Sequence, residues 1–346
     1  MISFTCDYNE GCHPAILERL AATNLEQEPG YGDDRFTAEA RAKIRQAVGC
    51  DSADVFLLTG GTQTNAIVID SLLHSYEGAI AADTGHIAVH EAGAIEMCRH
   101  KVLTLPGREG KISAEELSGY LSAFHADASA AHMVQPGLVY ISFPTEYGTI
   151  YSREELEQLH AVCRREHLPL FVDGARLGYG LACDAADIDL PQLARLCDVF
   201  YIGGTKVGAL CGEAVVFPQG NAPRHFFTSV KQHGGLLAKG RLLGLQFATL
   251  FTDGLYERLS RHAIAMAMQL KAVLERAGIP FFIDSPTNQQ FPILSPSHRR
   301  LLDGLVLYET WQQLPDGRCV ARFATSWATT QAQIDTLASL LSPRTI

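Results

Sequence analysis

Short apolar runs alternate with segments of helical period over roughly the first 250 residues, and no other feature of the sequence constrains the fold as strongly. The apolar runs end in turn residues and predict strands, or strands that continue into loops, at 54–61, 77–83, 101–107, 137–144, 168–175, 198–206 and 213–220. Helix candidates lie between them at 62–75, 152–167 and 189–197. In the second of these, Ser152 precedes Glu155 at the spacing of a capping box. This order predicts an α/β domain with a mainly parallel sheet.

The pattern changes after about residue 240, where a long helical stretch at 255–278 precedes further strand candidates. These candidates lie at 281–284, 290–294, 306–314 and 318–326 and predict a smaller α+β lobe. A chain of 346 residues also exceeds one ordinary core, so two lobes are expected. We predict an N-terminal segment over residues 1–15, a large domain over 16–248 and a small C-terminal domain over 249–346.

Composition and charge narrow the class of protein. Apolar residues make up 47% of the chain and charged residues 19%, which is typical of a globular enzyme. The 28 basic and 38 acidic side chains give a formal net charge of −10, which disfavours binding to nucleic acid or to anionic lipid. The nine cysteines form no CxxC pair and no His/Cys cluster at zinc-ligand spacing, so we expect reduced thiols and no metal site.

We also expect no signal peptide and no membrane span. Asp7 and Glu10 interrupt the stretch where a signal peptide would need apolar residues, and no apolar run reaches the roughly 18 residues of a membrane span. We therefore expect a cytoplasmic protein without a membrane partner.

Two candidate site motifs follow the early strands. The stretch from Thr59 to Asn65 places the glycine pair Gly60-Gly61 and several hydroxyls between a strand and a helix. Such a turn can present backbone N–H groups to a phosphate, although a plain turn with an N-cap would look the same. After the next strand comes His86, whose ring could stack on a planar cofactor or transfer protons, or could simply face solvent.

Two later strands end in charged residues. Asp173 ends a buried apolar run, and a carboxylate in that position needs a cationic partner. The protonated ring nitrogen of pyridoxal 5'-phosphate (PLP) is one such partner, whereas a metal ion or a helix cap is the alternative. Lys206 follows Gly203-Gly204-Thr205 at another strand end, a setting unusual for a surface lysine. The spacing does not fit a phosphate-binding P-loop, because Val207 occupies the position of the metal-binding hydroxyl, and no GxGxxG dinucleotide motif opens a helix.

Taken in order, these motifs resemble the threonine aldolase and β-eliminating lyase family of PLP-dependent enzymes, which have the aspartate-aminotransferase fold (fold type I). The resemblance spans almost the whole chain. The residues that support it are Tyr31-Gly32-Asp33-Asp34, Gly61-Thr62-Gln63, His86 with Glu91-Ala92-Gly93-Ala94, Asp173-Gly174-Ala175-Arg176, Lys206, Thr287-Asn288 and Arg322-Phe323.

The resemblance implies a role for each matching residue. It implies that Gly61 and Thr62 hold the cofactor phosphate, that His86 stacks on the pyridine ring, and that Asp173 pairs with the ring nitrogen. Lys206 would form the Schiff base with the cofactor. Arg176 would face a cofactor oxygen and the substrate carboxylate, and Arg322 would be a second clamp on that carboxylate, a task suited to the guanidinium fork.

Three positions depart from the better-known members. The chain has Tyr8-Asn9-Glu10 where those members have a small hydroxyl residue near the substrate, and Glu146 where many threonine aldolases have a second histidine. In the stretch HGGLLAKGR, Lys239 or Arg241 would be the basic residue that reaches the phosphate of a neighbouring subunit. We include Asn9 and Tyr31 among the expected substrate-binding residues.

The activity expected from the resemblance is PLP-dependent aldol cleavage of a β-hydroxy-α-amino acid, of the L-threonine or L-allo-threonine type, to glycine and an aldehyde. The candidate catalytic residues are Lys206, His86, Asp173 and Glu146, and the base is His86, Glu146 or a water between them. β-Elimination and transamination remain alternatives, because the same lysine, aspartate and arginines serve all three reactions. A non-catalytic PLP-binding protein is disfavoured by the two arginine clamps. The family also implies a homodimer or homotetramer with shared active sites.

Overall fold

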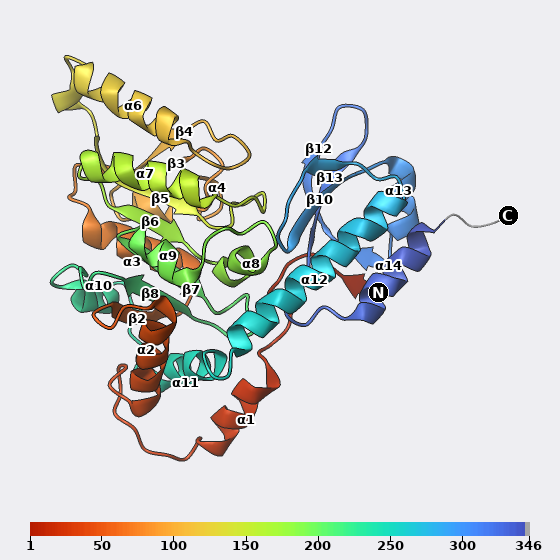
Figure 1. Ribbon diagram of the computed structural model, residues 1–346, viewed down its shortest axis with the longest axis horizontal. Helices are drawn as coiled ribbons and strands as arrows, with labels where there is room; N and C mark the ends of the chain where they lie inside the picture. The colour runs from red at the N-terminus through yellow and green to blue at the C-terminus, as the bar shows by residue number, and fades with distance from the viewer. Residues whose placement is uncertain (343–346) are drawn as a thin grey trace.

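The computed structural model describes residues 1–342, and its centre is a seven-stranded sheet in the order β2-β8-β7-β6-β5-β3-β4 (Figure 1). The strands are β2 (Asp54–Leu58), β3 (Glu77–Ala82), β4 (Lys101–Leu105), β5 (Gln135–Ser142), β6 (Leu170–Asp173), β7 (Val199–Gly203) and β8 (Glu213–Phe217). The pairs β3-β4, β3-β5, β5-β6 and β6-β7 are parallel, and β8 is antiparallel to both β7 and β2. Each of the seven strand predictions overlaps one of these strands, and the mainly parallel sheet is confirmed.

Helices cover both faces of this sheet. They are α1 (Pro14–Ala22), α2 (Arg35–Val48), α3 (Gly61–Leu72), α4 (His86–Val89), α5 (Ala94–Met97), α6 (Ala114–Ala126), α7 (Arg153–Arg165), α8 (Leu177–Ala182), α9 (Leu190–Arg195), α10 (Phe226–Gln232) and α11 (Arg241–Leu250), with a short 3₁₀ turn at Ala130–His132. The capping box predicted for α7 is present, because the Ser152 side chain accepts from the Glu155 N–H and the Glu155 side chain accepts from the Ser152 N–H.

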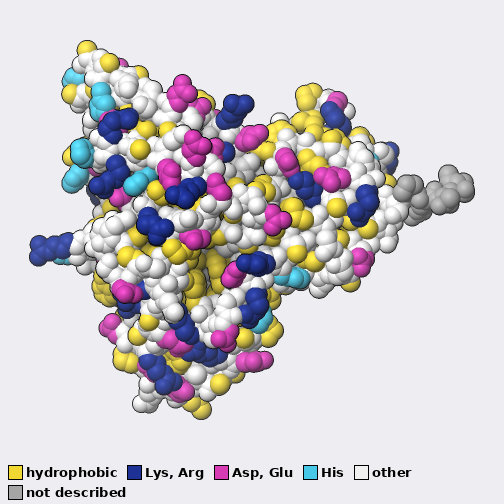
Figure 2. Space-filling view, in the orientation of Figure 1, with side chains coloured by type: hydrophobic (Ala, Val, Ile, Leu, Met, Phe, Trp, Pro, Cys, Tyr) yellow, Lys and Arg dark blue, Asp and Glu magenta, His cyan; other side chains and the backbone are white. Residues whose placement is uncertain are grey.

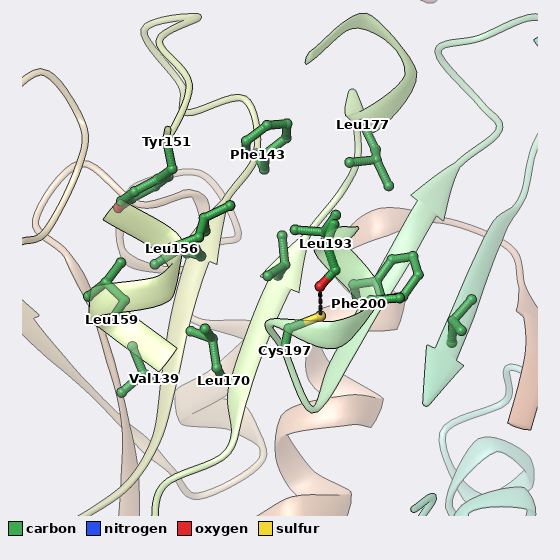
Figure 3. Packing of buried hydrophobic residues seen from close by; sticks show 14 of the residues in the cluster. Val139, Phe143, Tyr151, Leu156, Leu159, Leu170, Leu177, Leu193, Cys197 and Phe200 are labelled. Atoms are coloured by element: carbon green, nitrogen blue, oxygen red, sulfur yellow. Dashed lines mark hydrogen bonds between the residues drawn. The ribbon is translucent and has the colours of Figure 1, made fainter. Parts of the chain in front are cut away.

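Alternating side chains of the strands contribute to two separate hydrophobic cores, one on each face of the sheet. On β5, Val139 and Ile141 face the core shared with α2, α6, α7 and α9, whereas Leu138 and Tyr140 face the core shared with α3, α5 and α10. Figure 3 shows part of the first core, in which Leu156 and Leu159 of α7 pack over Val139 and neighbouring strand residues. Because both faces are covered, the strands are apolar on both sides, as expected for a parallel sheet.

The second lobe follows the long helix α12 (Leu255–Arg276), which runs from the large lobe into the C-terminal lobe (Figure 1). Its four-stranded antiparallel sheet has the order β12-β13-β10-β9. The elements are β9 (Phe281–Ile283), β10 (Gln289–Leu294), α13 (Pro296–Leu302), β11 (Val306–Leu307), β12 (Glu309–Gln313), β13 (Cys319–Ala324) and α14 (Gln331–Leu341). The N-terminal strand β1 (Ile2–Ser3) pairs with β11, so the chain begins in this lobe and then crosses to the large one. The domain boundaries at 15/16 and 248/249 stay predictions.

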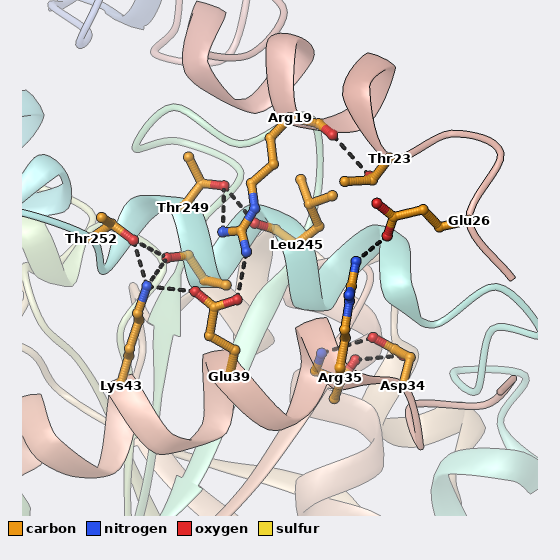
Figure 4. A network of polar contacts seen from close by, with 12 residues as sticks. Arg19, Thr23, Glu26, Asp34, Arg35, Glu39, Lys43, Leu245, Thr249 and Thr252 are labelled. Atoms are coloured by element: carbon orange, nitrogen blue, oxygen red, sulfur yellow. Dashed lines mark hydrogen bonds and ion pairs between the residues drawn. The ribbon is translucent and has the colours of Figure 1, made fainter. Parts of the chain in front are cut away.

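Polar contacts join α1, α2 and α11 at the base of the large lobe. Glu39 accepts from Arg19 Nη2 at 2.5 Å and from Lys43 Nζ at 2.6 Å, as Figure 4 shows. The helices α2 and α11 approach closely, since a Cβ on Gly244 would lie 2.4 Å from the Thr37 nitrogen. Partly exposed ion pairs of this kind stabilise a fold only modestly, so we assign them an alignment role rather than a large share of the folding energy.

Three further observations concern the surface charges, the thiols and the composition of the helices. On the face in Figure 2, basic and acidic side chains are interspersed, without a broad field of one sign. All nine cysteines are free thiols, and six of them are buried. Within residues 1–342, no helix combines the length and the apolar composition that crossing a bilayer would require.

Candidate active site

A pocket at the carboxyl ends of β5, β6 and β7 brings together six of the residues singled out from the sequence. They are Gly61, His86, Glu146, Asp173, Arg176 and Lys206. Their positions follow from the topology, because parallel strands end at the same edge of a sheet and loops from that edge meet above it. The pocket therefore joins side chains that lie up to 145 residues apart in the sequence, as the difference between 206 and 61 shows.

Asp173 is buried at the floor of this pocket and accepts four hydrogen bonds. Oδ1 accepts from the Tyr201 hydroxyl at 2.5 Å and from the Ala175 N–H at 3.0 Å. Oδ2 accepts from the Tyr140 hydroxyl at 2.6 Å and from Asn65 Nδ2 at 2.9 Å. Burial alone would raise the pKa of Asp173, but His86 and these donors outweigh it, so the pKa lies below its usual value. The side chain is a carboxylate at neutral pH.

Strand alternation explains why these donors surround Asp173. Phe171 of β6, Leu138 and Tyr140 of β5 and Tyr201 of β7 contribute to the core on the α3 side. Asp173 follows Phe171 by two residues and therefore points to the same side, toward Asn65 on α3. Because β5, β6 and β7 are neighbours, their side chains on that face meet.

His86 is tied to Asp173 through two buried side chains. Its Nδ1 lies 2.7 Å from Glu91 Oε1, and the same oxygen accepts from Asn65 Nδ2 at 2.7 Å. Burial by itself lowers the pKa of His86, whereas Glu91 and Asp173 raise it, and the net direction is upward. Glu91 thus fixes the ring orientation and favours the imidazolium form.

Glu146 lies on the wall of this pocket. Glu146 is buried. Its Oε1 accepts from Ser142 Oγ at 2.7 Å and from the backbone N–H of His86 at 2.9 Å. Burial raises its pKa above the ordinary value of a glutamate, although Ser142 partly opposes that rise. A carboxyl of this kind can exchange protons closer to neutral pH than an exposed one.

Lys206 lies three residues past the end of β7, in a turn held by Gly204 and Thr205, whose N–H groups both donate to the Gly212 carbonyl. Burial and the nearby Arg176 lower the pKa of its ammonium group. Beside the turn, the buried carboxyl of Glu213 accepts from Thr205 Oγ1 at 2.9 Å. Burial raises the pKa of Glu213 to about 8, although Lys206 acts in the opposite direction.

The raised pKa of Glu213 predicts a pH-dependent stability. Below its ordinary pKa of 4.5 the carboxyl is neutral in both states, and its contribution to stability is lost as the pH rises through about 8. In E213Q this loss is absent. The melting temperature of E213Q, relative to that of the native protein, should therefore rise by a few degrees between about pH 5 and about pH 9. Calorimetry beside E115Q, an exposed control, checks this, and a difference that is constant with pH would contradict it.

Arg176 is held by a residue that the sequence did not indicate as its partner. Its Nε and Nη2 donate to the two oxygens of the buried Asp7 at 2.7 and 3.0 Å. Asn288 Nδ2 also donates to Asp7 Oδ2 at 2.9 Å. Burial raises the pKa of Asp7, but Arg176 and Lys206 lower it further than burial raises it. One edge of the guanidinium fork is thus occupied, and Nη1 is the part that remains for a ligand carboxylate.

Two predicted ligand-binding residues lie close to this pocket without lining it. Thr62 follows Gly61 in the first turn of α3 and is exposed. Arg322, on β13 of the C-terminal lobe, pairs with Glu309 and donates to Gln289 Oε1 at 3.3 Å. Their roles stay predictions.

Three other predicted residues lie outside the pocket in this single chain. Asn9 is exposed, and its amide donates to Ser3 and Thr5 near the N-terminus. Tyr31 is 46% exposed and borders a separate hollow beside α2 and α11. Lys239 is exposed in the loop before α11. The family resemblance implies that Lys239 or Arg241 reaches the phosphate of a neighbouring subunit, so the role of Lys239 also stays a prediction.

Five residues of this site were not assigned a role from the sequence: Asn65, Tyr140, Tyr201, Asp7 and Glu213. Asn65 belongs to the glycine-turn motif that begins at Thr59. The period of the strands is enough to place Tyr140 and Tyr201 on one face of the sheet. The contact between Asp7 and Arg176 spans 169 positions, and no local pattern predicts it.

Comparison with known proteins agrees with the fold and the residue order. The family model described as beta-eliminating lyase matches residues 5–295. The chain is 30% identical over 343 residues to the low specificity L-threonine aldolase of Pseudomonas sp. (strain NCIMB 10558), covering 97% of this chain and 96% of that protein. It is also 30% identical over 298 residues to the low specificity L-threonine aldolase of Pseudomonas aeruginosa, covering 84% of each chain.

Solved structures of other proteins share the fold of this chain. A Leishmania major threonine aldolase superimposes with a TM-score of 0.95 at 42% identity, covering 99% of this chain and 98% of that one. An aspartate aminotransferase of Thermus thermophilus superimposes with a TM-score of 0.72 at 14% identity, covering 98% and 90%, which confirms fold type I. The chain belongs to the beta-eliminating lyase family, whose members are PLP-dependent lyases.

Proposed function

We propose that this chain binds PLP in the pocket around Lys206 and cleaves a β-hydroxy-α-amino acid of the threonine type. The observation that supports the cofactor most directly is Asp173, a buried carboxylate with a lowered pKa on the floor of the pocket that Lys206 also lines. A cationic ring nitrogen is the charge that such a carboxylate stabilises. Lys206 supplies an amine of lowered pKa for the cofactor aldehyde.

The beginning of α3 suits the cofactor phosphate. Gly60 is its N-cap and has no side-chain hydrogen bond to the first turn, so the leading N–H groups are available to an anion. Gly61 lines the pocket, and a Cβ there would lie 3.2 Å from the Tyr201 hydroxyl. Glycine at this position therefore keeps the space over the helix terminus open.

Bound PLP supplies an electron sink for the bond that breaks at the substrate Cα. When the cofactor is bound, Asp173 would keep its ring nitrogen protonated, and Arg176 and Arg322 would orient the substrate carboxylate through guanidinium donors. His86, whose orientation Glu91 fixes, would help to hold the cofactor ring. The products would be glycine and an aldehyde, in line with the names of the threonine aldolases that this chain is similar to.

We propose Glu146 as the base that removes the proton from the β-hydroxyl group of the substrate. Its Oε1 accepts one hydrogen bond from the Ser142 hydroxyl and one from the backbone N–H of His86, and these two bonds orient the carboxyl. Its raised pKa makes it a stronger base than an exposed glutamate. His86 is less suited because Glu91 favours its protonated form.

The variants E146Q and H86N separate these two bases. We expect E146Q to lower kcat/KM by about 10²-fold, a typical loss for a general base. In the native enzyme the rate should fall as the pH drops through the raised pKa of Glu146, because the base becomes protonated. This acidic limb should disappear from the pH profile of E146Q and remain in that of H86N. Loss of the limb in H86N alone would identify His86 as the base instead.

The reaction itself is tested by product analysis. Purified enzyme with PLP should release glycine and acetaldehyde from L-threonine and L-allo-threonine, and little pyruvate from cysteine or tryptophan. Pyruvate without glycine would assign β-elimination to this chain and overturn the aldolase proposal.

We also propose a homodimer or homotetramer in which Tyr31 and Lys239, both exposed in one chain, reach a neighbouring site. Sedimentation that detects only monomers at working concentration would contradict this. The cytoplasmic location stays a prediction from the sequence.

A further inference from the structure

A second cluster of ligand-type side chains lies at the far end of α3, away from the pocket. It consists of Asp70, Cys98 and His233, whose carboxylate oxygen, sulfur and ring nitrogen all lie within 4.8 Å of one another. Asp70 is nine residues after Gly61 on the same helix, which corresponds to about 13 Å along the helix axis. The cluster is therefore separate from the residues proposed to hold the cofactor.

The cluster joins three helix ends that are distant in sequence. Asp70 lies in the last turn of α3, Cys98 is the C-cap of α5, and His233 is the C-cap of α10. Both α5 and α10 pack on α3 over the shared apolar core. Helix C-termini carry partial negative charge, so their convergence favours a cation.

The hydrogen bonds within the cluster orient its oxygens and nitrogens. His233 Nε2 lies 2.8 Å from Asp70 Oδ2, and His100 Nε2 lies 3.2 Å from Asp70 Oδ1. The other ring nitrogen of His100 lies 3.1 Å from the Glu77 carbonyl. His100 is buried and thus holds the carboxylate from behind, as outer-shell histidines and carboxylates do around metal ligands.

Exposure decides whether an ion could enter. The side chains of Asp70 and His233 are 26% and 18% exposed, whereas Cys98 is 8% exposed at the inner end of the cluster. The site is therefore open on the Asp70 and His233 side, where a water could complete the coordination. Burial and Asp70 raise the pKa of the Cys98 thiol, and a bound divalent cation would favour the thiolate.

We propose that Asp70, Cys98 and His233 form a Zn²⁺ site that links α3, α5 and α10. A set of one oxygen, one sulfur and one nitrogen ligand suits Zn²⁺, whereas Mg²⁺ and Ca²⁺ prefer oxygen ligands alone. The sequence predicted no metal site, because the zinc-binding motifs that can be recognised in a sequence have ligands only a few residues apart. These three residues are separated by 28 positions, from 70 to 98, and by 135 positions, from 98 to 233.

The binding experiment uses the holoenzyme without an affinity tag, dialysed against Zn²⁺ and analysed for metal by atomic emission. We expect about one Zn²⁺ per chain, bound at least 10-fold more weakly by C98S and by H233Q. H100Q should weaken binding less, because His100 orients a ligand and is not one. The matched controls C50S and H74Q remove the same residue types elsewhere and should bind as the native enzyme does. Equal Zn²⁺ affinity in the native enzyme, C98S and H233Q would overturn the proposal.

A second measurement does not depend on the folding of C98S or H233Q. Co²⁺ added to the native holoenzyme should give a thiolate-to-cobalt charge-transfer band, which C50S retains and which excess Zn²⁺ removes. Zn²⁺ should also raise the melting temperature of the native enzyme and of H74Q, because it binds the folded state. Absence of the thiolate band at saturating Co²⁺ would rule out Cys98 as a ligand and so reject the site.

Discussion

Replacing Lys206 with alanine should lower kcat by about 10³-fold or more, because one amine serves both as the attachment point for the cofactor and as a proton carrier. The native protein with PLP should show a visible absorbance band, and this band should be absent from K206A. Borohydride reduction followed by peptide mass analysis should locate the cofactor on Lys206. The fold should persist, since Lys206 is only partly buried and lies in a turn.

The control for this prediction is K101A, which removes an exposed lysine from the edge strand β4. It should keep both the band and the activity. A native protein that stays colourless and does not bind added PLP would refute the cofactor proposal, whatever the activity of K206A.

Replacing Asp173 with asparagine should lower kcat by about 10² to 10³-fold at saturating PLP. The amide has nearly the same shape but no charge, so the cofactor nitrogen would lose the anion that keeps it protonated. Four donors converge on this carboxylate, and the amide nitrogen of asparagine would face at least one of them. A donor left without an acceptor costs about 1–3 kcal/mol, so D173N should also be less stable.

The kinetic and stability effects of D173N are measured separately, by steady-state assay and by denaturant unfolding. D184N, an exposed aspartate on the large lobe, is the matched control. A kcat within about threefold of the native value, in a D173N protein shown to hold PLP, would show that the charge of Asp173 is not needed. Y140F removes one donor but keeps the charge, and it should retain most of the activity.

The sequence by itself determined the seven strands of the large lobe, three of its helices and the position of the main site residues along the chain. Apolar runs and helical periods are local patterns, and a local pattern suffices to place Asp173 at the end of one strand and Lys206 just past the end of another. The capping box of α7 is equally local, since it depends on two residues three positions apart. Parallel strands then bring these strand ends to one edge, so the pocket could be predicted without coordinates.

Only the tertiary structure decided which side chains meet across the fold. Asn65 reaches Asp173 over 108 positions, and Asp7 reaches Arg176 over 169. The Zn²⁺ site that we propose also unites residues from three helix ends. A strand period states which face a side chain occupies, but it does not state which strand or helix lies opposite. That choice depends on strand order, helix packing and loop closure, which involve the whole chain at once and leave no local trace in the sequence.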